Sequence, residues 1–171
     1  SGTGTTGDQV RFADLNADGR ADYLTVATDG STKAWLNQGG NANGGWTALG
    51  TYASGTGTTG DQVRFADLNA DGRADYLTVA TDGSTKAWLN QGGNANGGWT
   101  ALGTYAPALG APGTQTLFAE ANGDGRSDYL AVASDGSIQM WTNNGAAISG
   151  GWSTVGMIAS GVGVPAGQVH I

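Results

Sequence analysis

The sequence repeats itself with a period of 53 residues, and this period restricts the possible folds more than any other feature. Residues 1–53 and 54–106 are identical, residues 107–159 form a diverged third repeat without insertions, and residues 160–171 begin a fourth. Equivalent units of this size bury their apolar residues by packing on their neighbours. The identity of the first two repeats indicates either a recent duplication or an engineered chain.

Each repeat contains four short segments with the alternating pattern of β-strands. In the first repeat they are residues 9–13, 23–27, 32–37 and 46–52. The pair Asp29-Gly30 between the second and third segments predicts a tight type I′ hairpin. Four antiparallel strands in about 40–50 residues is the period of a β-propeller blade, whereas a helical solenoid would show 3.6-residue periodicity. We therefore predict an all-β chain of about three blades, followed by the first strand of a fourth.

Composition agrees with this fold class and narrows the function. Glycine is abundant, with 32 residues, and only 12% of residues are charged, as expected for short strands joined by many turns. Seven scattered basic residues cannot form the stripe that nucleic-acid binding needs. The apolar runs are far shorter than the roughly 20 residues of a membrane span. We therefore expect neither nucleic-acid binding nor membrane insertion.

An acidic loop follows the first strand segment of every repeat. In the first repeat, oxygen-bearing side chains stand at loop positions 1, 3, 5 and 9, with a glycine at position 6. This spacing suits a cation, because alternate side chains and one backbone carbonyl can point inward. The predicted ligands are Asp14, Asn16, Asp18, Arg20 and Asp22; Asp67, Asn69, Asp71, Arg73 and Asp75; and Glu120, Asn122, Asp124, Arg126 and Asp128. Each arginine would contribute its backbone carbonyl.

Calcium fits these loops better than other metals. It takes six to eight oxygen ligands in flexible geometry, whereas Mg²⁺ demands a near-ideal octahedron and Zn²⁺ prefers nitrogen and sulfur. Three divalent ions would neutralise six of the seven net negative charges. We predict about one Ca²⁺ per blade, with the extra methylene of Glu120 placing one ligand differently in the third loop. The alternative is a metal-free loop in which Asp and Asn bond their own backbone.

The stretch Phe-Ala-Asp-Leu-Asn-Ala-Asp-Gly-Arg-Ala-Asp-Tyr-Leu at residues 12–24 resembles the FG-GAP/VCBS repeat of integrin-α-like β-propellers. The resemblance covers essentially the whole chain and implies a calcium loop between the first two strands of each blade, which makes the blade rigid. It also implies an extracellular adhesion or recognition module, such as the mushroom and bacterial propeller lectins, or a propeller attached to a secreted hydrolase. The absence of cysteine agrees with a secreted protein whose rigidity comes from calcium.

The sequence contains few of the residues from which catalytic sites are usually built. The only histidine is His170, and there is no cysteine, so no repeat carries a Ser-His-Asp or Cys-His arrangement. Equivalent repeats offer equivalent sites, which favours multivalent binding over one catalytic cleft. We therefore expect a binding module and not an enzyme.

The tryptophans suggest carbohydrate as the ligand, because each repeat has two indoles beside amide-rich connections. The alternative is that these rings pack between blades, as large aromatic surfaces commonly do. The candidate glycan-binding residues are Trp46, Asn37, Trp99, Asn90, Trp152 and Asn143. The tyrosines after each acidic loop, Tyr23, Tyr76 and Tyr129, are predicted to pack blade against blade. The alternative function is a protein-interaction or architectural propeller, natural or engineered, without glycan binding.

Three blades cannot close a propeller by themselves. Propellers close with roughly four to eight blades, and an open arc exposes two blade faces. The simplest solution is a homo-oligomer, with two chains giving six blades. Residues 160–171 complicate this arrangement because they repeat the sequence of residues 1–12 in diverged form.

Overall fold

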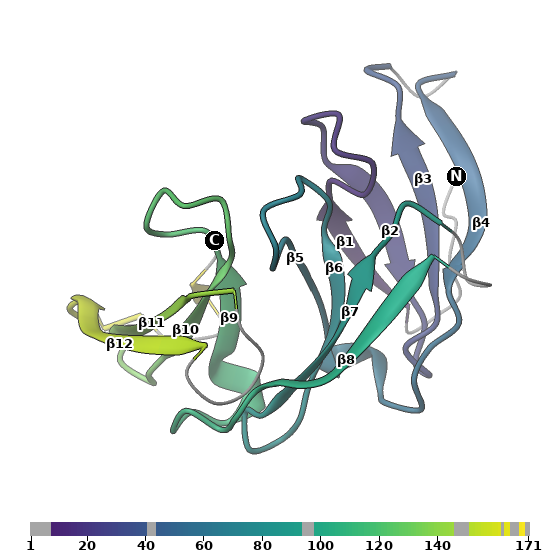
Figure 1. Ribbon diagram of the computed structural model, residues 1–171. Coiled ribbons are helices and arrows are strands. Elements are labelled where there is room, and N and C mark those ends of the chain that lie inside the picture. Colours follow the sequence, from purple (N-terminus) through teal and green to yellow (C-terminus); the bar gives the residue numbers. More distant parts are fainter. Residues whose placement is uncertain are drawn as a thin grey trace.

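The computed structural model confirms the all-β prediction. It describes residues 8–40, 44–93, 98–145, 151–161, 163–164 and 168–169, and within these ranges 12 strands form three four-stranded antiparallel sheets (Figure 1). Each sheet comes from one repeat, and its strands follow one another in chain order. We refer to the sheets as blades 1, 2 and 3. Figure 1 shows blade 2 between the other two.

The blades contain equivalent strands. Blade 1 consists of β1 (Gln9–Ala13), β2 (Asp22–Val26), β3 (Thr32–Asn37) and β4 (Trp46–Ala53); blade 2 of β5 (Val63–Ala66), β6 (Asp75–Val79), β7 (Thr85–Asn90) and β8 (Trp99–Ala106); and blade 3 of β9 (Thr116–Ala119), β10 (Asp128–Val132), β11 (Ile138–Asn143) and β12 (Trp152–Ala159). Short 3₁₀ turns, η1 (Gly60–Gln62) and η2 (Gly113–Gln115), precede blades 2 and 3. No helix among the described residues is long and apolar enough to cross a membrane. The four strand segments predicted for the first repeat are confirmed to within one residue.

The hairpin between β2 and β3 differs from the predicted type I′ turn. The backbone N–H of Gly30 donates to Ala27 O over 2.9 Å, and Gly30 alone in this turn has a positive φ, of 80°. Asp29 keeps a negative φ because its carboxylate accepts bonds from the backbone N–H and hydroxyl of Ser31. A type I′ turn needs both central residues at positive φ. The turn is therefore held by an aspartate side chain and followed by a left-handed glycine.

The apolar core lies between blades rather than within one. Leu24 and Tyr52 of blade 1 form a cluster against which Phe65 and Trp99 of blade 2 pack, and the same cluster recurs 53 residues later between blades 2 and 3. Among the described residues, Tyr23 contacts Trp35 and Trp46 of its own blade, so its predicted packing between blades is not confirmed. For Tyr76 the prediction is confirmed, because its buried hydroxyl donates to Gly30 O over 2.9 Å. Tyr129 makes the equivalent bond to Gly83 O over 3.3 Å.

Three side chains at each junction form a hydrogen-bonded set that we call the interblade clamp. Between blades 1 and 2, Asn90 Nδ2 donates to Leu15 O over 3.0 Å, and Asn90 Oδ1 accepts from the Tyr52 hydroxyl over 2.9 Å. Trp99 Nε1 donates to Tyr52 O over 3.0 Å. Between blades 2 and 3 the set consists of Tyr105, Asn143 and Trp152, with the carbonyl of Leu68 as the acceptor. Both amides are fully buried.

The two identical repeats provide a direct test of the clamp. Replacing Asn90 with Ala should lower the free energy of unfolding by about 2–4 kcal/mol, because several buried hydrogen bonds are lost and their partners stay unpaired. Asn37 has the same position in blade 1, but among the described residues its Nδ2 donates to Ala21 O of its own blade and to no other blade. Asn37→Ala should therefore cost about 1 kcal/mol or less. Urea denaturation measures both values, and equal costs would contradict the clamp.

Candidate metal centre and blade junctions

The acidic loops lie at one end of each blade. In blade 1 the loop joins β1 to β2, and the strand register pairs Ala13 with Asp22. The first and last loop acids are therefore brought together by strand pairing, although seven residues lie between them in sequence. The loops at 67–75 and 120–128 occupy the same position in blades 2 and 3, with Ala66 paired to Asp75 and Ala119 to Asp128.

The first acid of the loop organises its backbone. Asp14 Oδ1 accepts the backbone N–H of Ala17 over 2.8 Å, and Oδ2 accepts that of Gly19 over 2.7 Å. Asp18 Oδ1 accepts the backbone N–H of Arg20 over 2.9 Å. The second loop repeats these bonds from Asp67. The loop therefore contains the hydrogen bonds from Asp and Asn to its own backbone that the sequence suggested as the alternative. The side chains at positions 1, 3 and 5 accept bonds from backbone N–H groups of the loop.

The last acid of the loop has a different role. Asp22 is fully buried, and its two oxygens accept the backbone N–H groups of Leu15 over 2.9 Å and Asn37 over 2.8 Å. It therefore ties the loop to the end of β3. Asp75 and Asp128 bridge the same two segments in blades 2 and 3.

The donor set has the chemistry of a calcium site. Carboxylate and amide oxygens are the ligands that Ca²⁺ prefers. Among the residues that the structure describes, however, no group of three or more His, Cys, Asp or Glu side chains is arranged to hold a metal. The Arg20 guanidinium lies 3.4 Å from Asp18 Oδ2, and the equivalent arginines lie 3.6 Å from Asp71 and 3.7 Å from Asp124. The calcium ligands therefore stay a prediction.

The third loop differs in its backbone as well as in Glu120. Loop position 4 has a positive φ in every blade: 63° at Ala17 and Ala70, and 88° at Gly123. Alanine in this left-handed region costs roughly 1–2 kcal/mol, whereas glycine does not. The third loop thus lacks the strain of the other two. Glu120 Oε1 accepts the backbone N–H of Asn122 over 2.9 Å, so the longer acid still organises the loop.

The structure divides the six predicted glycan-binding residues into two groups. Asn90 and Asn143 are 0% exposed and belong to the interblade clamps together with Trp99 and Trp152, so these amides do not face a ligand. Trp46 is 37% exposed, and Asn37 beside it is half-buried. The physical difference is the preceding blade, which covers the positions in blades 2 and 3. Trp99 and Trp152 are half-buried like Asn37, so burial excludes the two amides, Asn90 and Asn143, from glycan contact but does not exclude the indoles.

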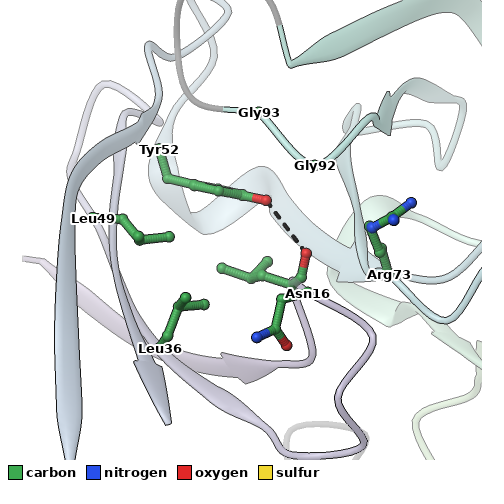
Figure 2. A pocket seen from close by; sticks show the side chains of 8 residues that line it. Asn16, Leu36, Leu49, Tyr52, Arg73, Gly92 and Gly93 are labelled. Carbon is green, nitrogen blue, oxygen red and sulfur yellow. Dashed lines mark hydrogen bonds between the residues drawn. The ribbon is translucent and has the colours of Figure 1, made fainter. Parts of the chain in front are cut away.

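Two cavities lie at the junction of blades 1 and 2, where sequence patterns within one repeat could not indicate them. The larger, of about 430 Å³, is lined by Leu15, Asn16, Leu36, Leu49, Tyr52, Arg73, Gly92 and Gly93. Figure 2 shows Leu36, Leu49 and Tyr52 on one side of this cavity and Arg73 on the other. The smaller, of about 190 Å³, is lined by Ala53, Ser54, Gly55, Thr56, Tyr76, Trp88 and Trp99.

Comparison with known proteins agrees with the predicted resemblance. The FG-GAP-like repeat family matches residues 14–78, which extend from the first acidic loop to β6 of blade 2. Residues 14–78 are therefore similar to an FG-GAP-like repeat. A search of curated proteins finds no match.

Two solved structures share the fold of this chain. The crystal structure of TcdB2-TccC3 aligns with a TM-score of 0.55 at 20% identity, covering 86% of this chain and 6% of that one. The Tc holotoxin pore of Photorhabdus luminescens aligns with a TM-score of 0.56 at 20% identity, covering 91% and 7%. The likeness supports the propeller-like arrangement of blades. This chain spans less than a tenth of the length of either match.

The last acid of each acidic loop has a raised pKa. Burial raises the pKa of Asp75 to about 7, against the opposing effect of the two backbone N–H groups that it accepts. The nearby carboxylates of Asp71 and Asp67 raise the pKa further. Burial also raises the pKa values of Asp22 and Asp128. Between pH 4 and 7, the metal-free folded chain therefore binds a proton on Asp75 more strongly than the unfolded chain does.

These raised pKa values predict how stability depends on pH without metal. The folded pKa of Asp75 is about 7 and its ordinary value is 3.8, so its stabilising contribution is complete below pH 4 and is lost as pH rises towards 7. Hydrogen bonds from Ser31 lower the pKa of Asp29, so Asp29 changes the free energy of unfolding only below pH 4. In chelator, the free energy of unfolding should fall by about 1–3 kcal/mol between pH 4.5 and 7.5. Urea denaturation along this series measures it, and a rise in stability would contradict the prediction.

Proposed function

We propose that this chain is an architectural segment, a rigid wall of β-propeller blades braced by calcium. The interblade clamp is the observation that carries this proposal. It uses an indole, a buried amide and a tyrosine at each junction, which are the groups that a sugar-binding surface would need to expose. Because Trp99 and Asn90 bond to blade 1, their contribution is to stiffness rather than to ligand capture.

Hydrogen bonds between successive acidic loops also support an architectural role. The backbone N–H of Ala74 donates to Asp14 O over 2.7 Å, and that of Ser127 donates to Asp67 O over 2.7 Å. The acidic loops of blades 1 and 2 are therefore each bonded to the loop of the next blade. An ion that fixes one loop would stiffen both its own blade and the adjoining junction.

The predicted loop ligands are the residues that would hold this ion. Bound Ca²⁺ would supply positive charge to acids that otherwise repel one another, and it would compete with the Arg20 and Arg73 guanidinium groups for Asp18 and Asp71. A nearby cation favours the charged form of a carboxyl group. It would therefore oppose the burial that raises the pKa of Asp75.

The context of the similar structures supports an architectural role. Both come from Tc toxins, one described as TcdB2-TccC3 and the other as a holotoxin pore, in which the matching segment is a small part of a very long chain. By analogy, this segment would contribute to the wall of a larger assembly, outside the cell as expected for calcium-dependent rigidity. The analogy concerns the fold and carries no toxin activity to this chain.

Calcium should raise the thermal midpoint of unfolding, because an ion that binds only the folded state stabilises it by mass action. We expect a rise between chelator and about 10 mM CaCl₂ that MgCl₂ does not reproduce. Asp71→Asn keeps an oxygen for the Arg73 backbone N–H but removes a charge, so it should reduce the rise by about a third. Asp82→Asn, the same change in a hairpin turn, should leave the rise intact. Scanning calorimetry measures all three proteins, and a midpoint indifferent to calcium would refute the calcium brace.

A second candidate function, glycan binding, has one specific observation in its favour. The 190 Å³ pocket at the blade 1–2 junction brings Trp88 and Tyr76 close to the hydroxyl-bearing residues Ser54 and Thr56. Aromatic faces beside hydroxyl groups can stack a sugar ring and bond its substituents. This pocket requires two blades, so its ligand would be recognised at a junction and not by one repeat.

A glycan array read with and without chelator separates the two functions. The architectural function predicts no retained glycan in either condition. Binding that Trp88→Ala abolishes would instead establish the junction pocket as a sugar site. Trp35→Ala is the matched control, because Trp35 occupies the same position in blade 1, where the described structure has no preceding blade.

A further inference from the structure

The larger cavity at the junction of blades 1 and 2 combines an apolar wall with a single charge. Leu36, Leu49 and the ring of Tyr52 lie on one side of it, and Arg73 lies on the other (Figure 2). Leu15 adds a further apolar side chain. Among the described residues that line the cavity, Arg73 is the only charged one. Its volume of about 430 Å³ lies in the range of pockets that bind small molecules.

The guanidinium group of Arg73 is positioned by its own blade. Gly92 has a positive φ of 77°, and a Cβ atom there would lie 3.8 Å from Arg73 Nε, so the guanidinium packs beside a backbone without a side chain. The Asp71 carboxylate lies 3.6 Å from Arg73 Nη1, and the two side chains are 29% and 36% exposed. An ion pair with this exposure is weak. The guanidinium is therefore oriented, and it still has N–H donors for a second carboxylate.

The charge of Arg73 acts across the cavity on Tyr52. Burial raises the pKa of the Tyr52 hydroxyl, and the positive charge of Arg73 opposes this rise. The carboxylates of Asp22 and Asp75 act in the opposite direction. An anion in the cavity would therefore be attracted by Arg73 and repelled by the loop acids. Contact with the apolar wall must supply part of the binding free energy.

The other polar groups that line the cavity already have partners. Asn16 Nδ2 donates to Asp18 Oδ2 over 3.2 Å. The Gly92 backbone N–H and the Tyr52 hydroxyl each donate to Asn90 Oδ1 over 2.9 Å. A sugar ring or a peptide backbone would need several hydrogen-bonding groups, whereas a simple carboxylic acid needs only the guanidinium. The lining therefore favours a ligand with one polar end.

We propose that this cavity binds a small apolar carboxylic acid, with its carboxylate on Arg73 and its hydrocarbon body against Leu49 and Tyr52. Arginine can bind a carboxylate through two parallel N–H bonds, which also fixes the direction of the ligand. The site requires two blades, because Arg73 belongs to blade 2 and the apolar wall to blade 1. The inference adds a ligand to the architectural wall and does not depend on bound calcium.

An NMR titration in chelator, followed at the backbone amides of Gly92 and Gly93, tests the site. The probe is hydrocinnamate, a phenyl ring on a short chain that ends in a carboxylate. We expect a dissociation constant of about 1 mM, because a ligand of this size with one ion pair gains modest affinity. Hydrocinnamamide lacks the charge and acetate lacks the apolar body. Each should bind at least about tenfold more weakly.

Three variants connect the binding to the cavity. Arg73→Gln should weaken hydrocinnamate binding at least about tenfold, because the charged hydrogen bonds are lost. Asp71→Asn should tighten it about two- to fivefold, because the competing carboxylate is removed. A purely structural role of Arg73 would not produce this gain. Lys86→Gln is the matched control: it removes the same charge from an exposed residue of blade 2 that does not line the cavity, and it should leave binding unchanged.

Circular dichroism of every variant provides the control for folding. Should Arg73→Gln not fold, Asp71→Asn and the uncharged ligand still test the proposal. Unchanged Gly92 and Gly93 resonances at about 20 mM hydrocinnamate would overturn it, as would equal binding of hydrocinnamate and its amide. Tighter binding of N-acetyl-leucine would also overturn it, because the ligand would then be the carboxyl end of a peptide. The calcium-dependent thermal midpoint is measured separately, so failure of this inference is distinguishable from failure of the architectural function.

Discussion

The structure depends on a buried asparagine that connects two blades and two loops. Asn90 donates to Leu15 O in the loop of blade 1 and to Ala74 O in the loop of blade 2, while its own backbone N–H is held by Asp75. The Tyr52 hydroxyl donates to its Oδ1. A four-stranded sheet with one face uncovered buries too little surface for independent stability. The network therefore fixes how one marginal sheet lies on the next.

This network links the charge of the last loop acid to the hydrogen bonds that connect two blades. The carboxylate of Asp75 positions the backbone of Asn90, and Asn90 in turn holds the loop that contains Asp14. A proton or an ion that changes the last loop acid thus acts one bond away from the contact between blades. Protonation of the last loop acid and stability of the blade junction are expected to vary together, because Asp75 positions the backbone of Asn90.

Sequence periodicity was sufficient for the architecture. The 53-residue repeat, the alternating strands and the tyrosines after the loops predict blades that pack on one another, and the structure confirms the repeat, the strands and the packing of Tyr76 and Tyr129. The roles of Asn90 and Trp99 could not be predicted in this way, because their partners Leu15 and Tyr52 lie 75 and 47 residues earlier in the chain. A pattern within one repeat shows that an amide and an indole are present but not that a neighbouring blade covers them. The hairpin type was wrong for a similar reason, since the Asp29 side chain competes for the turn.

The third repeat shows how such an interface tolerates change. It keeps Asn143 and Trp152 of the clamp and also Tyr129, and all three side chains donate to backbone carbonyls of blade 2. On its opposite face, Leu and Tyr are replaced by Ala121 and Ile158. A side-chain donor cannot be replaced without loss of its bond, whereas a backbone acceptor survives any substitution that preserves the fold. The two faces of a blade therefore differ in the substitutions that they tolerate. The face whose side chains donate hydrogen bonds must keep those side chains. The face whose backbone carbonyls accept the bonds can change its side chains and still pack on the neighbouring blade.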